Sequence, residues 1–371
     1  MFTLRQYLLA LLDSRGLTRT LGEIDVCRDE QGRPCFSAGN SAAVFRIRLG
    51  GRIRSLRCYL RPMRHLKEIY GQRLLEKELY LHTSPETGVW VDTVLGDWIE
   101  GSTLHETVAQ AAALRDRECL QILVRLFDRL ALALVTDDRA HGDLKPENII
   151  VGDDGTLCPI DFDASYLPAF AGEISPELGT AAYQHPARTA ADFDERIDDY
   201  PAALISTALH ALAEDPTLWD RYGSSDGLLY TPQRIASDPA YRETLALFEK
   251  RGMAVQYRIA QLLTAPTLRL FGLAELFAEA VREKPAARSG MEAETPELFV
   301  ENGRWGYRTA ERVVVAPLYD NGFDFTEGLA AVQLGGTWHY IDTAGRTRLS
   351  CPGCAAVKPL SLIHISEPTR R

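Results

Sequence analysis

The sequence predicts an α+β protein in which a small strand-rich lobe precedes a larger helical lobe and a short all-β segment. Residues 44–49 and 53–60 cluster branched and aromatic side chains around a Gly50-Gly51 turn, which is typical of a β-hairpin. From Leu120 to Leu134, apolar residues recur three and four positions apart, the stripe of a helix packed along one side. Strands that precede helices in one run indicate two lobes of different secondary structure.

The regions follow one another along the chain. Residues 1–20 are expected to form an N-terminal helix. Residues 21–97 form the strand-rich lobe, with a charged helical stretch at 64–81 between its strands. Helical patterns dominate residues 98–283. Residues 284–297 are polar, lack aromatic side chains and contain Pro, Gly and Ser, which is typical of an exposed linker.

A repeat occupies residues 298–359. The strings NGRWGYRTA (302–310) and GGTWHYIDTAGR (335–346) align Trp305 with Trp338, a period of 33 residues. Because small β units need aromatic anchors, we expect the aromatic residues to form the repeats' own core rather than a ligand face. These residues are Trp305, Tyr307, Tyr319, Phe323, Phe325, Trp338 and Tyr340.

The last residues depart from the repeat pattern. A third unit begins after CPGCAAVKP (351–359), but the sequence then runs LSLIHISEPTR (360–370), which resembles the translated transposase adapter of sequencing libraries. We therefore expect residues 360–371 to be non-native and the repeat array to be cut short, and we exclude them from the fold. The CPGC pair supplies at most half of a four-ligand zinc site, and we interpret it as a turn.

The composition is that of a folded, acidic protein. Hydrophobic residues make up 46% and charged residues 25% of the 371, and 41 Lys plus Arg oppose 51 Asp plus Glu. The net charge of -10 would repel nucleic acid and anionic membranes, so neither is an expected partner. The longest apolar run, 202–213, is too short to span a membrane and reads as a buried helix. Absence of a signal-peptide pattern and mostly scattered cysteines favour a cytoplasmic protein with reduced thiols.

The segment HGDLKPENIIVGDDGTLCPIDFD (141–163) carries the candidate chemistry. It places Asp143, Lys145 and Asn148 in one loop and Asp161 at the end of a following strand. Phosphoryl transfer needs an oriented nucleophile and a neutralised triphosphate. Asp143 can accept a hydrogen bond from an attacking hydroxyl, and Lys145 can contact the γ-phosphate. Asn148 and Asp161 offer the oxygen ligands that Mg²⁺ prefers.

With this segment in place, residues from about 21 to 283 resemble a protein kinase domain of the bacterial serine/threonine type, and residues 298–359 resemble WG-type β repeats. The resemblance implies a bilobal fold with ATP and Mg²⁺ as cofactors and a protein hydroxyl as acceptor. HGDLKPEN matches the catalytic loop, which implies that Asp143 is the base, that Lys145 also takes part, and that Asn148 ligates the metal.

Other parts of the kinase pattern lie nearby. Asp161-Phe162-Asp163 matches the metal-binding DFG segment with Asp in place of its glycine, and GTAAYQHP (179–186) resembles the end of the activation segment. Asp198 resembles the buried Asp that braces the catalytic loop, which His141 also supports. Gly142 stands where many regulated kinases carry Arg, so we expect little control by phosphorylation of Ser175 or Thr180.

The part of the kinase pattern that is expected to bind the nucleotide is less complete. AGNSAAVF (38–45) retains one glycine of a glycine-rich loop, which implies nucleotide contacts from Gly39, Ser41 and Val44. Residues 98–104 resemble the hinge, so Trp98 and Glu100 are expected beside adenine.

The expected ion pair at the phosphates also departs from the pattern. Arg57 stands where the phosphate-binding lysine is expected; it keeps the charge but has a planar fork in place of an ammonium group. Its helix partner is expected to be Glu76, with Glu68 and Glu78 as alternatives.

Two other functions remain open. Arg57 and the thin glycine loop favour a nucleotide-binding pseudokinase scaffold, although the complete set of Asp143, Asn148 and Asp161 weighs against it. A small-molecule kinase of the aminoglycoside or choline kinase type also begins its loop with His-Gly-Asp, but Lys145 favours a protein kinase. The repeats are expected to bind a protein partner or to position the substrate.

Overall fold

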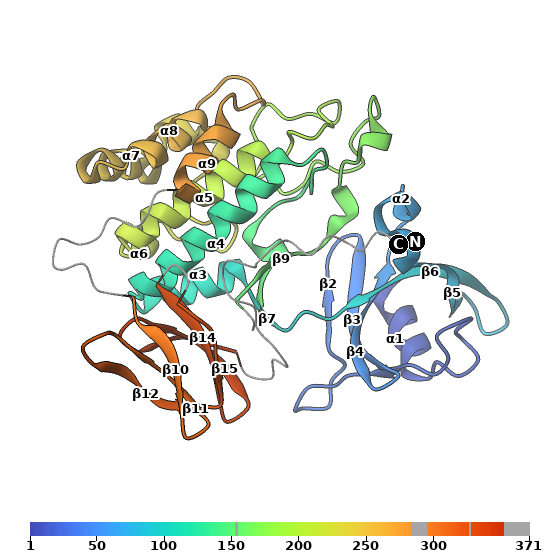
Figure 1. Cartoon of the computed structure of the whole chain (residues 1–371). Helices are drawn as coiled ribbons and strands as arrows, with labels where there is room; N and C mark the ends of the chain where they lie inside the picture. The colour runs from blue at the N-terminus through green and yellow to red at the C-terminus, as the bar shows by residue number, and fades with distance from the viewer. Residues whose placement is uncertain (153–154, 283–294, 326–327, 352–371) are drawn as a thin grey trace. The chain divides into compact units, whose positions relative to one another are not determined.

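The computed structural model describes residues 1–152, 155–282, 295–325 and 328–351 (Figure 1). Most of the expected linker, residues 284–294, and the expected adapter-derived tail, 360–371, lie outside the described residues. The chain divides into two units, residues 1–99 and residues 100–371. It is a mixed α/β protein with strands first, helices in the middle and strands at the end. Within the described residues, no helix combines the length and the apolar composition that a membrane span requires.

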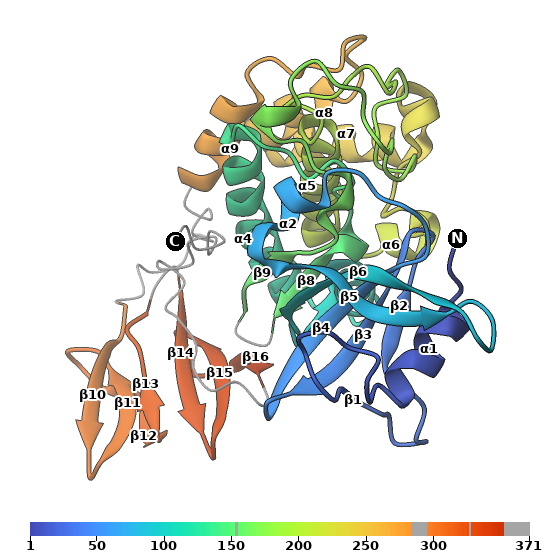
Figure 2. The same cartoon turned by 90° about the vertical axis from the view of Figure 1, so that its right-hand side faces the viewer.

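The first unit is an antiparallel sheet with one long helix against it. Its strands are β1 (Asp25–Val26), β2 (Phe36–Ala38), β3 (Ala42–Leu49), β4 (Arg52–Tyr59), β5 (Leu74–His82) and β6 (Gly88–Asp97). They pair in the order β1-β3-β4-β6-β5, and β2 adds to β3. The helix α1 (Leu4–Leu12) begins with a capping box between Thr3 and Gln6. Figure 2 shows α1 beside the sheet, where its Tyr7 and Leu11 share a core with Phe45 and Leu56.

The predicted helix at 64–81 is wrong beyond Tyr70. The short helix α2 (Leu66–Tyr70) ends at Gly71, whose φ of 53° breaks the α-helical path, and one 3₁₀ turn (Gly71–Arg73) follows. The chain then enters β5, where Leu79 and Leu81 alternate into the core. A register shift between Leu75 and Leu79, with Lys77 at a φ of 51°, interrupts the strand alternation. Because the bulge interrupts the alternation of buried and exposed residues, the hydrophobic periodicity of the sequence does not predict this strand.

The helical part of the second unit is built around a buried helix. Its elements are β7 (Gly101–Thr103), α3 (Leu104–Ala113), α4 (Arg117–Thr136), β8 (Ile149–Gly152), β9 (Leu157–Pro159), α5 (Asp199–Glu214), α6 (Leu218–Tyr222), α7 (Pro239–Arg251), α8 (Ala254–Leu262) and α9 (Leu273–Arg282). α5 is buried from Asp199 to Ala213, as expected for a helix that is apolar all round. The predicted stripe of α4 packs against it, with Phe127 and Leu130 in the main core.

A buried polar cluster joins α4 and α5. The carboxylate of Asp128 accepts a hydrogen bond from Ser206 Oγ at 2.7 Å and lies 2.8 Å from His210 Nε2. All three side chains are buried. Because an unpaired buried carboxylate would be costly, the two partners fix how the helices meet.

The second unit ends in two small antiparallel sheets. One contains β10 (Glu297–Glu301), β11 (Arg304–Arg308) and β12 (Val313–Tyr319). The other contains β13 (Asn321–Gly322), β14 (Leu329–Leu334), β15 (Thr337–Asp342) and β16 (Thr347–Cys351). Trp305 lies on β11 and Trp338 on β15, each an inner strand of its sheet.

The aromatic residues of the repeats do form core, as predicted. Tyr307 and Tyr319 are buried in a cluster that Trp305 and Phe325 also contact. Trp338 and Tyr340 belong to a second cluster, and this one includes Ile122 and Leu126 of α4. The core is therefore not the repeats' own throughout, because one of its two clusters is shared with a helix more than two hundred residues away in sequence.

Candidate active site

The loop at residues 141–148 is held by Asp198, the residue directly before α5. Asp198 is buried, and its two carboxylate oxygens accept the backbone N–H groups of His141 and, at 3.0 Å, Gly142. Burial raises the pKa of Asp198, while these two amides and the nearby Arg188 favour its charged form. With one backbone amide on each oxygen, Asp198 fixes the loop at His141 and Gly142.

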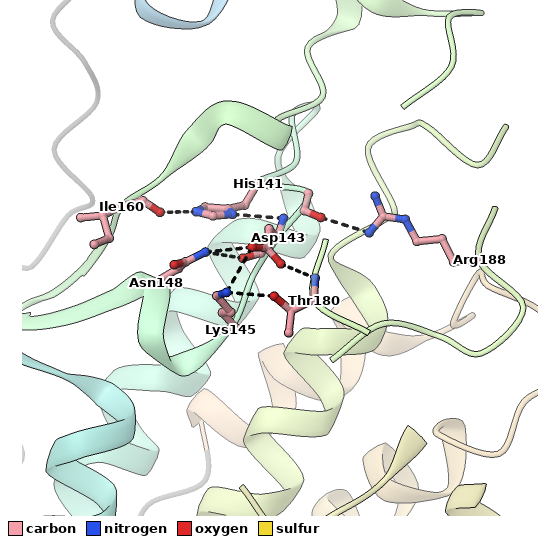
Figure 3. Close-up of polar contacts among 8 residues, drawn as sticks. His141, Asp143, Lys145, Asn148, Ile160, Thr180 and Arg188 are labelled. Atoms are coloured by element: carbon pink, nitrogen blue, oxygen red, sulfur yellow. Dashed lines mark hydrogen bonds and ion pairs between the residues drawn. The ribbon is translucent and has the colours of Figure 1, made fainter. Parts of the chain in front are cut away.

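The ring of His141, the first residue of this loop, also fixes the conformation of the loop. Its Nε2 lies 2.7 Å from the carbonyl oxygen of Ile160, and its Nδ1 accepts the backbone N–H of Asp143 at 3.3 Å (Figure 3). Because Nδ1 accepts, the proton of the neutral ring lies on Nε2 and is donated to Ile160. Both predicted supporting residues, His141 and Asp198, therefore contact the loop.

Asp143 lies at the centre of the polar contacts in Figure 3. Its Oδ1 accepts the backbone N–H of Thr180 at 2.6 Å, and its Oδ2 accepts Asn148 Nδ2 at 3.2 Å. Lys145 Nζ lies 3.5 Å from the same Oδ2 and donates to Thr180 Oγ1 at 2.9 Å. The Asp143 side chain is 19% exposed, so its carboxylate is fixed in place and still reachable from solvent.

Two glycines permit this arrangement. Gly142 has a φ of 81°, and a Cβ there would lie 2.0 Å from the carbonyl oxygen of Ala164. Gly179 has a φ of 72°, and a Cβ there would lie 2.7 Å from the Gly142 carbonyl oxygen and 3.0 Å from Asp143 Oδ1. A larger residue at position 142 would displace Ala164, and one at position 179 would displace the 141–148 loop.

Asn148 and Asp161 come together through the β8–β9 hairpin. Ile149 pairs with Pro159, and Ile160 N donates to Asn148 O at 2.9 Å, so both residues emerge at one end of the hairpin. Asp161 has a φ of 68°, a left-handed conformation that few residues other than glycine adopt. Asn148 uses Nδ2 for both of its bonds to Asp143, so its Oδ1 is the atom that could ligate a cation. This donor set fits Mg²⁺.

The expected phosphate-binding residues of the first unit lie on one face of its sheet. Val44 and Arg57 are cross-strand partners, and their side chains point away from Leu56 and Cys58, which share the core with α1. The guanidinium of Arg57 lies 5.8 Å from the centre of the Tyr59 ring. A bond from Gly39 N to Ala42 O closes the turn between β2 and β3, which includes Ser41.

The three candidate glutamates have different surroundings. Glu76 lies on β5 rather than on a helix, and its carboxylate is 3.4 Å from Lys67 Nζ. Glu78 is buried, and its carboxylate accepts the backbone N–H groups of residues 19–21. Glu68 lies in the first turn of α2. Glu78 is therefore a structural cap for the N-terminal segment, a role that its sequence context did not reveal.

The two expected hinge residues fall on either side of the boundary between the units. Trp98 belongs to the first unit, where the guanidinium of Arg46 lies 5.5 Å from the centre of its ring. Glu100 is the first residue of the second unit and is exposed. The structure thus brings together His141, Asp143, Lys145 and Asn148 with Asp198, places Asp161 at the same end of the β8–β9 hairpin as Asn148, and separately pairs Val44 with Arg57.

Sequence comparisons find one matching family model and similarity to protein kinases. Residues 308–338 match the family model described as the WG containing repeat. CBL-interacting protein kinase 17 of Oryza sativa subsp. japonica is 28% identical over 172 residues, which cover 44% of this chain and 35% of that protein. Serine/threonine-protein kinase PknL of Mycobacterium tuberculosis is 34% identical over 113 residues, 29% of this chain and 27% of that protein.

The chain is kinase-like, with WG repeats. It spans only about a third of the length of the kinases that it matches. The PknL protein of Mycobacterium bovis gives the same figures as that of Mycobacterium tuberculosis.

Proposed function

We propose that this protein is a serine/threonine protein kinase that transfers the γ-phosphate of ATP to a protein hydroxyl. The observation that carries the proposal is the fixed carboxylate of Asp143 with Lys145, Asn148 and Thr180 around it. In this proposal residues 21–97 and 98–283 are the two lobes of a kinase fold. Residues 298–359 are repeats that bind a partner or position the substrate.

Each residue of the loop has a distinct task in the reaction. Asp143 accepts a hydrogen bond from the attacking hydroxyl and receives its proton, because its side chain is partly exposed and each carboxylate oxygen can accept a further hydrogen bond. Lys145, held between Asp143 and Thr180, places its ammonium beside the incoming phosphoryl group. Asn148 and Asp161 would hold Mg²⁺, which neutralises the charge of the triphosphate.

The contact between Lys145 and Thr180 favours a protein acceptor. It ties the 141–148 loop to the 179–186 segment, so the Asp143 carboxylate is oriented from two sides. A segment held in this way provides a fixed surface beside Asp143, along which an extended peptide can bind. A small-molecule acceptor does not require such a surface.

The second candidate is a nucleotide-binding scaffold without transfer activity. It is favoured by Arg57 at the lysine position, by a helix α2 of only five residues, and by Glu76 bonded to Lys67. If Arg57 has no helical glutamate to orient it, its planar fork must hold the phosphates alone.

Transfer of labelled γ-phosphate to a basic protein and to the chain itself tests the proposal. We expect wild type to label an acceptor, Asp143→Asn to reduce the rate at least a hundredfold, and Arg57→Lys to raise it. Mg-ATP binding by wild type without transfer, even with Arg57→Lys, would favour the scaffold. Asp137→Asn, an exchange of the same kind on an exposed turn, serves as the control.

A further inference from the structure

Arg188 reaches the 141–148 loop from the segment that follows Thr180 (Figure 3). Its Nη1 donates to the carbonyl oxygen of Gly142 at 3.1 Å and also contacts Gln184 Oε1. Gly142 is the turning point of the loop, directly before Asp143. The Arg188 guanidinium that is bonded to the Gly142 carbonyl therefore helps to set the direction in which the backbone enters Asp143.

Position 142 itself cannot supply this charge. Its φ of 81° and the 2.0 Å approach of a Cβ to the Ala164 carbonyl exclude a side chain there. The amide of Gly142 is bonded to Asp198, so the peptide is held on its N–H side by a carboxylate and on its carbonyl side by Arg188. The two contacts together fix the orientation of this turn.

The charges around Arg188 point to the same role. Burial lowers the pKa of Arg188, and the carboxylates of Asp198 and Asp143 counteract that effect more than those of Asp192 and Asp194 do. Its Nε and Nη2 are buried without a hydrogen-bond partner among the described residues. Such unsatisfied donors destabilise a fold, so an arginine placed only for packing would be a poor choice here.

The hydroxyls of the neighbouring segment are already engaged. Ser175 is buried, and its Oγ donates to the Glu177 carbonyl. Thr180 Oγ1 accepts Lys145. Neither hydroxyl can carry a phosphate without breaking its present contacts, so the segment is held against the loop without a phosphate, by Lys145, Asp143 and Arg188.

We propose that Arg188 is a positioning residue that assembles the 141–148 loop with the 179–188 segment and so replaces a phosphorylated residue as the organiser of the site. The inference rests on the proposed function, which it deepens by making the site self-assembled. Arg188 balances the Asp143 and Asp198 carboxylates and holds the Gly142 carbonyl. It acts on the reaction only through Asp143.

Two measurements on the full chain test this role, with the variants Arg188→Met and Arg188→Lys. In hydrogen exchange, we expect Arg188→Met to lose protection at the amides of Gly142 and Thr180, while helices α7 and α8 keep theirs. In phosphoryl transfer, we expect kcat to fall about ten- to a hundredfold with an unchanged KM for Mg-ATP. Arg188→Lys keeps a cation and should lie between, and added guanidinium ion should partly restore Arg188→Met.

Arg115→Met is the matched control, because Arg115 also donates to backbone carbonyls, those of Ala112 and Pro216. A fall in melting temperature alone, with kcat and the exchange of Gly142 and Thr180 unchanged, would overturn the proposal. If wild type transfers no phosphate, the proposed kinase function fails. The exchange measurement then decides the role of Arg188 by itself.

Discussion

Replacement of Asp198 by asparagine tests how firmly α5 holds the 141–148 loop. Asp198 is 1% exposed, and each of its oxygens accepts one backbone N–H, from His141 and Gly142. Asparagine keeps one acceptor and sets an NH₂ group against the other backbone N–H. A lost bond to a charged acceptor costs about 1.5–3 kcal/mol, and an unsatisfied buried donor about 1–3 kcal/mol. We expect Asp198→Asn to lower the free energy of unfolding by about 3–5 kcal/mol.

Urea unfolding of the full chain at neutral pH measures this change. Asp199→Asn is the matched control, because Asp199 is the next residue, is also buried and undergoes the same chemical change. Burial raises the pKa of Asp199 to about 7, so the loss of its charge removes an unfavourable group. The reasoning is refuted if Asp198→Asn unfolds at the wild-type urea concentration, or if Asp199→Asn is the more damaging variant.

Three further outcomes are expected. Between about pH 4 and about pH 7 the native chain keeps a proton on Asp199 that the unfolded chain has lost, so its contribution to stability falls as pH rises. Urea unfolding across this range should show a shallower fall in Asp199→Asn; an unchanged slope contradicts the assignment. Gly142→Ala should cut phosphoryl transfer at least about tenfold, since its Cβ meets the Ala164 carbonyl; full activity would show that the loop can relax. Asp128→Ala should destabilise the chain by about 3–5 kcal/mol by leaving His210 without its partner, with Asp128→Asn milder in the same unfolding assay; equal losses would mean that the hydrogen bonds an amide can keep contribute nothing.

The grouping of the central candidate residues could be predicted because they are close in the chain. Asp143, Lys145 and Asn148 lie within six positions, so any fold that keeps the loop keeps them together. Asp198 is distant, and its burial was expected only from the resemblance to the kinase pattern; the structure places it directly before the buried helix α5.

Other parts of the structure left no local pattern. Arg188 carries no periodic or motif signal, and its importance depends on a carbonyl 46 positions earlier in the chain. The bulge at Lys77 turned a strand into an apparent helix. The contact of Trp338 with α4 was also missed, although Ile122 and Leu126 offered a clue as an apolar i, i+4 pair beside the main stripe.

The shared cluster of α4 and the second repeat limits how this chain can be recombined. Ile122 and Leu126 are buried by Trp338 and Tyr340, and the Tyr340 ring lies close against Gly155 in the turn between β8 and β9. Repeats taken from another protein would have to match these positions before they could be grafted onto this lobe. If the helical part of the second unit were produced without the repeats, Ile122 and Leu126 would be exposed to water as an apolar patch. Any shortened version of the chain should therefore carry polar substitutions at positions 122 and 126.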